Sequence, residues 1–471
     1  MTLAPHEFVN LTAGSFRRSY NRFEENSMSA VRGSVTVAMK HLFLGASIIG
    51  CVAGGSATTH GQPKGFACDK DNGGLTLPAG FCAGVIADNL GTARNLVVAP
   101  NGDIFVSVRS GPSVQGQPPQ PGFILGLRDT DGDGRIDLQE KFGTQGATGI
   151  RLRNGYLYYS TPTSIERFKM APGELKPSGP AEVIVGDFPS GANQRGHRDK
   201  DIAFDNAGNV YVNVGLPSNA CAEPDRQKGA KGVDPCPQLE EHGGIWKFSA
   251  DTPGQKFSKA NRYATGMRQP VALDWHDGNL YVAMNSRDSL DTLYPEHFTV
   301  EDNVNRPLEP LLLVKPGSVF GWPYCFFDGQ ANKMILAPEY GGDGKEVGRC
   351  AQFETPVANF PAHYAPVDLL FYSGRMFPAH YRGGAFMTSH GSWNRAPAPM
   401  AGYNILFQPF AGGKPSGKFE VFADGFKGRD PLMSPADAAA RPNGTAQGPD
   451  GSLYITESVK GKTWRVIYNG K

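Results

Sequence analysis

The stretch Ile202-AFDNAGNVYVNV-Gly215 carries the pattern that decides the fold of this chain. Apolar residues alternate with polar ones on both sides of a glycine-containing turn, which is typical of a hairpin between two half-buried β-strands. Five further stretches repeat this strand–turn–strand pattern with Asn-Gly, Asp-Gly or Ser-Gly turns: Asn95-LVVAPNGDIFVSV-Arg109, Ile150-RLRNGYLYY-Ser160, Val271-ALDWHDGNLYVAM-Asn285, Val367-DLLFYSGRMFPAHYRGGAFMT-Ser389 and Thr445-AQGPDGSLYIT-Glu457. The chain therefore contains six copies of one hairpin unit.

The spacing of the six hairpins indicates how they are arranged. Their turn glycines (Gly102, Gly155, Gly208, Gly278, Gly374 and Gly451) lie 53 to 96 residues apart. A four-stranded propeller blade needs about 40–50 residues, so each interval holds one blade and its loops. The sequence predicts an all-β protein with a six-bladed β-propeller of four-stranded antiparallel blades over residues 81–471. A tandem of two-sheet sandwiches is the alternative.

The two ends of this region supply the strands that would close the ring. Residues 84–91 near its start and 463–469 at its end both have strand-like composition, and together they would complete one blade. The extra residues at 286–366 and 390–445 are expected to form loops over one mouth of the propeller.

The composition excludes several other classes of protein. The chain has 471 residues, of which 60 are glycine and 37 proline without a strict period, so it is neither a coiled coil nor collagen. Hydrophobic residues make up 39% and the net charge is +1, which fits a large core and provides no basic surface for nucleic acid.

The first 80 residues are predicted to be processing and linker segments. Residues 39–51 have a basic start and an apolar run too short to span a bilayer, as in a secretory signal peptide. This run ends in Ile48-IG-Cys51, which resembles a lipobox, so Cys51 is a candidate lipid anchor; ordinary cleavage near Ala57 is the alternative. We expect residues 1–38 to be a disordered upstream extension and residues 52–80 to be a linker. The mature protein would lie in the periplasm or cell envelope.

The cysteines support export. Six remain besides Cys51, and they form three pairs that are close in sequence: Cys68 with Cys82, Cys221 with Cys236, and Cys325 with Cys350. Disulfides of this local connectivity are expected, although six cysteines permit 15 connectivities. A metal or haem role has little support because neither CxxC nor CxxCH occurs.

A calcium-binding pattern lies between two predicted strands of the first blade. Asp129-TDGDGRIDLQ-Glu140 matches the twelve-residue loop of an EF-hand in full. The flanking residues read as strands, so we expect a structural calcium site with these ligands: Asp129, Asp131, Asp133, Asp137 and Glu140. An acidic turn without metal and a functional ion are the alternatives.

Polar and cationic residues recur where the predicted hairpins begin and end. His197 and Arg268 precede the third and fourth hairpins, Arg94 and Arg441 precede the first and sixth, and Ser389-HGSWN-Arg395 follows the fifth. Because these positions meet at one mouth of a propeller, they predict a cationic funnel with a base and a planar stacking group. Such a funnel suits a polyanionic aromatic cofactor or an acidic ligand. The alternative for His197 is a surface histidine in a polar loop.

Several pieces of the sequence resemble the soluble quinoprotein sugar dehydrogenases, the glucose/sorbosone dehydrogenase family. They are Gly196-H-Arg198, Ala264-TGMRQPVA-Leu273, Phe320-GW-Pro323, His390-GSWN-Arg395 and Gly448-PDGSLYIT-Glu457. The third and fourth are closer to the sorbosone or pyranose dehydrogenase branch. The resemblance covers about residues 80–471 and implies a six-bladed propeller that binds pyrroloquinoline quinone (PQQ) and Ca²⁺.

The resemblance also implies roles for individual residues. His197 resembles the family's catalytic base, and Arg268 resembles the arginine beside the quinone carbonyls. Residues that would contact the cofactor are Arg94, Gln269, His390, Trp393, Asn394, Arg395 and Arg441. Asn285, Ser286 and Asp288 lie where the family places ligands of the active-site calcium, mostly through backbone carbonyls.

The implied activity is oxidation of a sugar, a sorbosone-like aldehyde or a polyol, with hydride transfer to PQQ and electrons passed to an external quinone or soluble carrier. Two rivals remain at this point: a calcium-dependent lactonase or esterase, and a non-catalytic propeller that binds carbohydrate or protein. No G-x-S-x-G, Walker, Rossmann or H-E-x-x-H motif occurs in the sequence, which lowers the weight of serine hydrolase, nucleotide and zinc-protease functions.

Overall fold

Each of the six predicted hairpins forms the two inner strands of a four-stranded antiparallel sheet. The structure is a computed structural model that describes residues 65–470 except 111–120, 147 and 190–196. Blade 1 contains β2 (Ala93–Val98), β3 (Ile104–Val108), β4 (Phe123–Arg128) and β5 (Leu138–Phe142). Blade 2 contains β6 (Ile150–Arg153), β7 (Tyr156–Ser160), β8 (Ile165–Lys169) and β9 (Glu182–Gly186). Blade 3 contains β10 (Ile202–Phe204), β11 (Asn209–Val214), β12 (Gly244–Ser249) and β14 (Arg262–Thr265).

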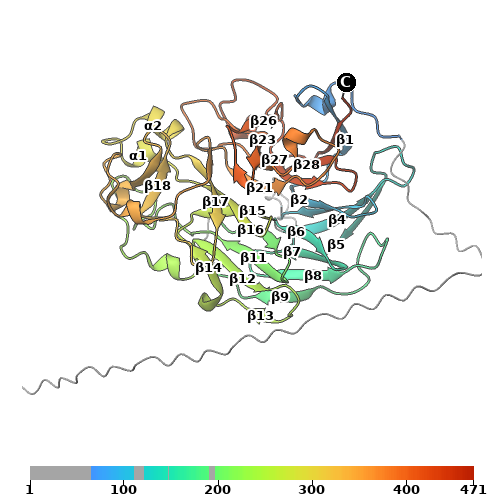
Figure 1. Ribbon diagram of the computed structural model, residues 1–471, viewed down its shortest axis with the longest axis horizontal. Helices are drawn as coiled ribbons and strands as arrows, with labels where there is room; N and C mark the ends of the chain where they lie inside the picture. Colours follow the sequence, from blue (N-terminus) through green and yellow to red (C-terminus); the bar gives the residue numbers. More distant parts are fainter. Residues whose placement is uncertain (1–64, 111–120, 147, 190–196, 471) are drawn as a thin grey trace, which may run out of the picture. The chain divides into compact units, whose positions relative to one another are not determined.

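The remaining three sheets continue the same order along the chain. Blade 4 contains β15 (Gln269–His276), β16 (Asn279–Asn285), β17 (Glu309–Val314) and β20 (Ala358–Phe360). Blade 5 contains β21 (Pro366–Phe371), β22 (Ala385–Ser389), β23 (Asn404–Gln408) and β26 (Glu420–Ala423). Blade 6 contains β27 (Pro442–Gln447), β28 (Leu453–Glu457), β29 (Thr463–Tyr468) and β1 (Phe81–Ala87). Figure 1 shows these sheets following one another around a centre, so the predicted six-bladed propeller is confirmed.

The ring is closed by pairing the start of the propeller with its end. β1 pairs antiparallel with β29, from Phe81 opposite Tyr468 to Ala87 opposite Thr463. This closure removes the free edge that an open sheet would leave. The closing strand begins three residues earlier than the sequence pattern predicted. Residues ahead of it also contact the propeller, because the backbone of Thr76 pairs with that of Asp424.

Short strands and helices lie outside the four-stranded core of the blades. β13 (Gln255–Lys256) adds a parallel strand to blade 2, and two small hairpins join β18 (Cys325–Asp328) to β19 (Lys333–Leu336) and β24 (Phe410–Ala411) to β25 (Lys414–Pro415). Two α-helices and seven 3-10 helices are described: α1 (Leu290–Leu293), α2 (Val300–Asn305), η1 (Asn72–Gly74), η2 (Pro237–Glu240), η3 (Lys259–Asn261), η4 (Pro338–Tyr340), η5 (Gly348–Gln352), η6 (Ala379–Tyr381) and η7 (Pro435–Asp437). Within the described ranges, no helix is long and apolar enough to cross a membrane.

The hydrophobic core lies between neighbouring blades. Between blades 5 and 6, Phe377, Phe386 and Phe422 pack against one another with ring centroids 4.8–6.2 Å apart, and Phe81 of the closing strand meets Phe377 edge-on. Burying each ring contributes about 1.5–3 kcal/mol, so this cluster holds the closing blade in place.

A polar clasp joins the innermost strands at the centre. Asn95 Nδ2 donates to both Asp201 and Asp368 at 3.3 Å, and Arg151 lies 3.3 and 3.7 Å from the same carboxylates. Asp368 also accepts from the Thr445 amide at 2.6 Å. These five residues come from blades 1, 2, 3, 5 and 6. Apolar periodicity does not predict this clasp, because its members are polar residues that only the closed ring brings together.

All three predicted disulfides are present. Cys68–Cys82 ties the segment before β1 to the closing strand, whereas Cys221–Cys236 and Cys325–Cys350 cross-link loops of blades 3 and 4. Residues 1–38, the signal segment 39–51 and Cys51 lie outside the described residues.

Candidate active site

One cavity of about 630 Å³ lies where the first strands of the blades begin and the second strands end. In a hairpin these two points share one edge of the sheet, which is why positions distant in sequence converge here. Nearly every site residue predicted from the sequence lines this cavity: His197, Arg268, Arg94, Gln269, His390, Trp393, Asn394, Arg441, Asn285, Ser286 and Asp288. His363 lines it as well.

Two arginines on one side of the cavity share a single carboxylate. Asp199 Oδ2 lies 3.0 Å from Arg94 Nη2 and 3.1 Å from Arg109 Nη1. Burial lowers the pKa of Arg94 to about 10, which still leaves it charged at neutral pH. Its Nε is buried and has no hydrogen-bond partner among the described residues. This side therefore carries a net positive charge and an unused donor.

A second carboxylate organises the other side of the cavity. Asp288 Oδ2 lies 2.6 Å from Arg268 Nη2 and 2.8 Å from Arg226 Nη2, while Asn394 donates to Asp288 Oδ1. The neighbouring guanidiniums hold the pKa of Asp288 well below its usual range despite burial. Arg268 is only 2% exposed, and its Nε has no described partner. Asp288 thus fixes Arg268 while leaving one of its donors for a ligand.

Arg441 and His390 form the wall contributed by blades 5 and 6. Arg441 donates from Nε and Nη2 to the carbonyls of His390 and Gly391 at 3.2 and 2.9 Å. The contacts described for its guanidinium include no carboxylate; Glu457 Oε2 accepts from the backbone amide of Arg441 at 3.4 Å. His390 Nδ1 lies 3.0 Å from the carbonyl of Pro442, and burial followed by Arg441 lowers the pKa of His390 well below its ordinary value. His390 is therefore neutral.

His197 is held in one tautomer by the backbone. Its Nδ1 lies 2.5 Å from the carbonyl of Leu216, which can only accept, so Nδ1 carries the proton and Nε2 is free to take one. Burial, followed by the charge of Arg268, lowers the pKa of His197 to about 3. The ring is therefore a neutral proton acceptor at physiological pH.

Gly215 makes room for this histidine. A Cβ at position 215 would lie 1.9 Å from Gln269 Oε1 and 2.8 Å from the carbonyl oxygen of His197. Only a residue without a side chain lets the loop before β10 and the start of β15 approach this closely. The buried Gln269 Oε1 has no donor among the described residues, so its amide is another group available to a ligand.

The structure adds four residues that sequence patterns missed: Arg109, Asp199, Arg226 and Glu309. Asp199 stands two residues after His197, and Arg109 ends a hairpin at the position that Asn285 occupies in blade 4, so position alone could have indicated both. Glu309 opens the apolar strand β17 and accepts the amide of Ser286 at 2.6 Å. Burial raises the pKa of Glu309 to about 8, so most of it is protonated at neutral pH.

Arg395 is not part of this cavity, contrary to the sequence-based expectation. It lines a separate cavity and donates to the carbonyls of Pro399 and Val304 at 3.1 and 3.0 Å. The side chains of Asn394 and Arg395 leave the loop in different directions, which a short motif does not reveal. Trp393, in contrast, does line the cavity that contains His197 and Arg268, and it is 57% exposed.

The Asp288 side chain differs from a calcium ligand in its surroundings. Both of its carboxylate oxygens accept from cationic or amide donors. Asn285 donates its amide to the carbonyl of Pro366 at 2.6 Å. The carboxylate of Asp288 is therefore already engaged by these donors, and the backbone carbonyls of residues 285 and 286 remain candidate calcium ligands.

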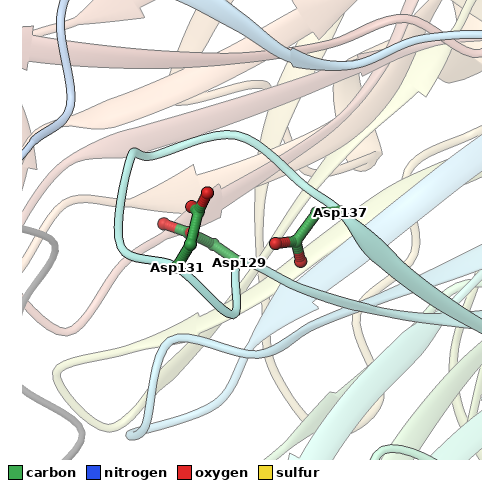
Figure 2. A group of neighbouring side chains, drawn as sticks. All are labelled: Asp129, Asp131 and Asp137. Carbon is green, nitrogen blue, oxygen red and sulfur yellow. The ribbon is translucent and has the colours of Figure 1, made fainter.

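The loop that matches the calcium-binding pattern, residues 129–140, begins directly after β4 and runs into β5, between two strands as predicted. Carboxylate oxygens of Asp129, Asp131 and Asp137 lie within 4.8 Å of one another, and Figure 2 shows the three side chains inside the loop. Asp133 and Glu140 do not join this group. Glu140 lies in β5 opposite Gly126 and pairs with Lys176 at 2.8 Å, because a strand rather than a helix follows the loop.

Several solved structures share this architecture. By fold, this chain is similar to the PQQ domain of a pyranose dehydrogenase from Coprinopsis cinerea in its holo form (17% identity, 83% of this chain and 97% of that chain, TM-score 0.64). It is also similar to a calcium structure of a Trichoderma reesei enzyme of carbohydrate-active family AA12 (16% identity, 84% and 97%, TM-score 0.67). The soluble aldose sugar dehydrogenase of Escherichia coli shares 15% identity over 82% of this chain and 99% of its own, with a TM-score of 0.53.

Sequence comparison adds a relative and a family. An uncharacterized protein of Borreliella burgdorferi is 29% identical over 217 residues, which is 45% of this chain and 50% of that protein, so the match spans about half of the relative's length. The model of the family described as TrAA12-like matches residues 75–469, which include the whole propeller. The chain belongs to the TrAA12-like family.

Proposed function

We propose that this protein is a PQQ-dependent dehydrogenase that oxidises a sugar or a related polyol or aldehyde. The observation that carries the proposal is the convergence of five guanidiniums and the neutral, oriented His197 in a single cavity. Membership of the TrAA12-like family and the fold shared with a PQQ domain and with aldose sugar dehydrogenase support the same conclusion.

The charge of the cavity fits the cofactor. Among the described lining residues, five arginines face two ionised carboxylates, those of Asp199 and Asp288, because Glu309 is mostly protonated. The excess of three positive charges matches the three carboxylates of PQQ. Guanidiniums suit this ligand because their paired N–H groups match the geometry of a carboxylate. The buried, unpartnered Nε atoms of Arg94 and Arg268 are donors that such a ligand would satisfy.

The residues that would hold the cofactor follow from these unused donors. Arg94, Arg441 and the amide of Gln269 would bind carboxylate or carbonyl oxygens, and Trp393 offers an exposed ring for stacking. Arg268 would stand beside the oxygens on which negative charge develops. PQQ, when bound, supplies an acceptor for the hydride that leaves the substrate carbon.

His197 would act as the general base. Its free Nε2 would accept the proton of the substrate hydroxyl while the Leu216 carbonyl holds Nδ1–H. Burial, and then the nearby charges of Arg268 and Arg226, lower the pKa of His197 in the protein alone. Negative charge bound in the cavity opposes those two charges, so it raises the pKa of His197 and makes the imidazole a better base.

Calcium and the electron acceptor complete the proposal. Backbone carbonyls at residues 285 and 286 are the candidates for an active-site Ca²⁺, whereas the carboxylate of Asp288 serves Arg268 and Arg226. An external quinone or soluble carrier would accept the electrons.

Export completes the picture of where the enzyme works. The three disulfides fit an oxidising compartment, the periplasm or the cell envelope. Residues 39–51 would serve as the signal peptide, and Cys51 would carry a lipid anchor if the lipobox-like sequence is processed as such.

Reconstitution tests the proposal directly. The purified protein is titrated with PQQ in the presence and absence of Ca²⁺, and dye reduction is followed with aldoses, sorbosone and polyols. We expect stoichiometric PQQ binding, and reduction with one substrate class that is lost in His197→Ala while binding persists. Arg441→Gln should weaken PQQ binding at least tenfold, whereas the exposed Arg262→Gln should not. Absence of PQQ binding at micromolar concentration contradicts the proposal.

A further inference from the structure

A second cavity is lined by residues that neighbour, in sequence, residues of the first cavity. It has a volume of about 290 Å³ and is lined by Arg395, Tyr364, Asn359, Phe360 and Phe419, among others. We call it the flanking cavity. The two cavities share two chain segments: His363 lines the first cavity and its neighbour Tyr364 the flanking one, just as Asn394 lines the first and Arg395 the flanking one. No described residue lines both cavities, so the flanking cavity is separate from the proposed cofactor site.

Arg395 brings a positive charge to the flanking cavity without a matching negative one. Its Nε and Nη1 donate to the carbonyls of Pro399, Val304 and Ala362 at 3.1, 3.0 and 3.4 Å. In the described part of the chain no carboxylate forms an ion pair with Arg395, and no hydrogen bond is described for its Nη2. Three carbonyls hold the guanidinium rigidly, and its charge is left for a ligand.

The rest of the lining suits a small polar molecule with an apolar face. The buried Oδ1 of Asn359 has no hydrogen-bond donor in the described ranges, although buried amide oxygens are normally paired. Phe419 lies half-buried with its ring 6.0 Å from that of Phe360, and Tyr364 adds a third aromatic side chain. Aromatic faces bind the C–H surface of a ring, and the amide oxygen accepts a hydroxyl proton.

From these contacts we infer that the flanking cavity binds a carboxylate-bearing monosaccharide unit, such as a uronic acid. Arg395 pairs with the carboxylate, Asn359 accepts from a hydroxyl, and Phe419 packs against the ring. The size of the cavity, at the small end for ligand sites, fits one sugar unit and not a cofactor. This site goes beyond the proposed oxidation, because it needs neither PQQ nor a reaction.

Calorimetric titration of the cofactor-free protein tests the inference. The probes are D-glucuronate, D-glucose and acetate, which separate the carboxylate from the sugar ring. We expect glucuronate to bind at least tenfold more tightly than either of the others. Arg395→Gln should weaken glucuronate binding at least tenfold, whereas Arg262→Gln, an exposed arginine that also donates to a backbone carbonyl, should leave it unchanged.

Two further variants keep the test decisive. Arg441→Gln reports on glucuronate bound in the first cavity, so binding lost in that variant and retained in Arg395→Gln overturns the inference. Phe419→Ala keeps the charge and should still weaken glucuronate binding, and it replaces Arg395→Gln if that variant does not fold. Acetate binding as tightly as glucuronate, or glucose doing so, would also overturn the inference. Failure of PQQ to bind would leave these results unaffected.

Discussion

Arg268 and Asp288 form a buried ion pair across the wall of the candidate active site, with Nη2 2.6 Å from Oδ2 and neither residue more than 6% exposed. Asp288 also pairs with Arg226 at 2.8 Å, so one carboxylate orients two cations. Arg226 belongs to the loop cross-linked by Cys221–Cys236. The position of Arg268 therefore depends on a residue and a loop far from it in sequence.

Removing this carboxylate should cost both stability and function. Asp288→Asn leaves two guanidiniums without their anion, and breaking a buried pair costs about 3–5 kcal/mol. Urea unfolding should show that loss, and PQQ binding should weaken. The control is Asp430→Asn, which removes an exposed pair with Lys427 and should cost less than about 1 kcal/mol. Equal unfolding midpoints for Asp288→Asn and the wild type would contradict this role.

The lowered pKa of His197 predicts how stability varies with pH. The pKa is about 3 in the folded protein and about 6.5 in the unfolded chain, so the unfolded chain binds more protons between these values. The contribution of His197 to stability is therefore present above pH 6.5 and is lost as the pH falls toward 3. The drop in urea midpoint between pH 7.5 and pH 4.5 should be smaller in His197→Gln than in the wild type. The exposed His297→Gln should retain the full drop.

Gly215→Ala should damage the site more than the fold. The new methyl group would overlap Gln269 Oε1 and the backbone of His197, so one of these residues must move. We expect activity of the reconstituted enzyme to fall at least tenfold, with a smaller change in melting temperature. Gly179→Ala is the control, because a Cβ there meets nothing within 4 Å. Unchanged activity in Gly215→Ala would show that His197 and Gln269 tolerate displacement.

The central clasp should become more dependent on pH when its cation is removed. Burial raises the pKa of Asp368 to about 7, so this carboxyl gains charge as the pH rises toward 8, and burial also raises the pKa of Asp201. Arg151→Met should therefore destabilise the protein more at pH 8 than at pH 5, because the carboxylates are unpaired and ionised at the higher pH. Chemical unfolding at both pH values measures this difference. Arg375→Met, at an exposed position, should show no such dependence.

Two substitutions in the loop between β4 and β5 distinguish the observed group of three carboxylates from the full twelve-residue calcium pattern. If Asp129, Asp131 and Asp137 hold Ca²⁺, the ion stabilises the fold by about 2.7 kcal/mol at a hundredfold excess over its Kd. Asp129→Asn should abolish the rise in melting temperature on adding Ca²⁺, and Glu140→Gln should preserve it. Loss of the rise in Glu140→Gln as well would mean that the twelve-residue pattern, and not the observed grouping, describes the site.

Much of the site was accessible from sequence because of hairpin geometry. His197, Arg268 and Arg441 stand at equivalent points of repeated hairpins, and a propeller brings equivalent points to one mouth. Arg226 and Glu309 could not be found in this way. Arg226 lies in a loop whose path has no periodicity, and Glu309 opens a strand that reads as ordinary core. Arg395 was misplaced because adjacent loop residues face different cavities, which depends on the local backbone.

The sequence by itself determined the six hairpins, their order, the three disulfides and the edge at which polar residues gather, since each follows from local periodicity, turn chemistry or short separation. Only the tertiary structure decided which charges meet. The sharing of Asp288 by Arg268 and Arg226, the clasp of Asp201 and Asp368, and the isolation of Arg395 all arise when closure of the ring brings distant loops together and excludes water between them. Electrostatic partnership depends on distance and burial, and neither is encoded in a local pattern.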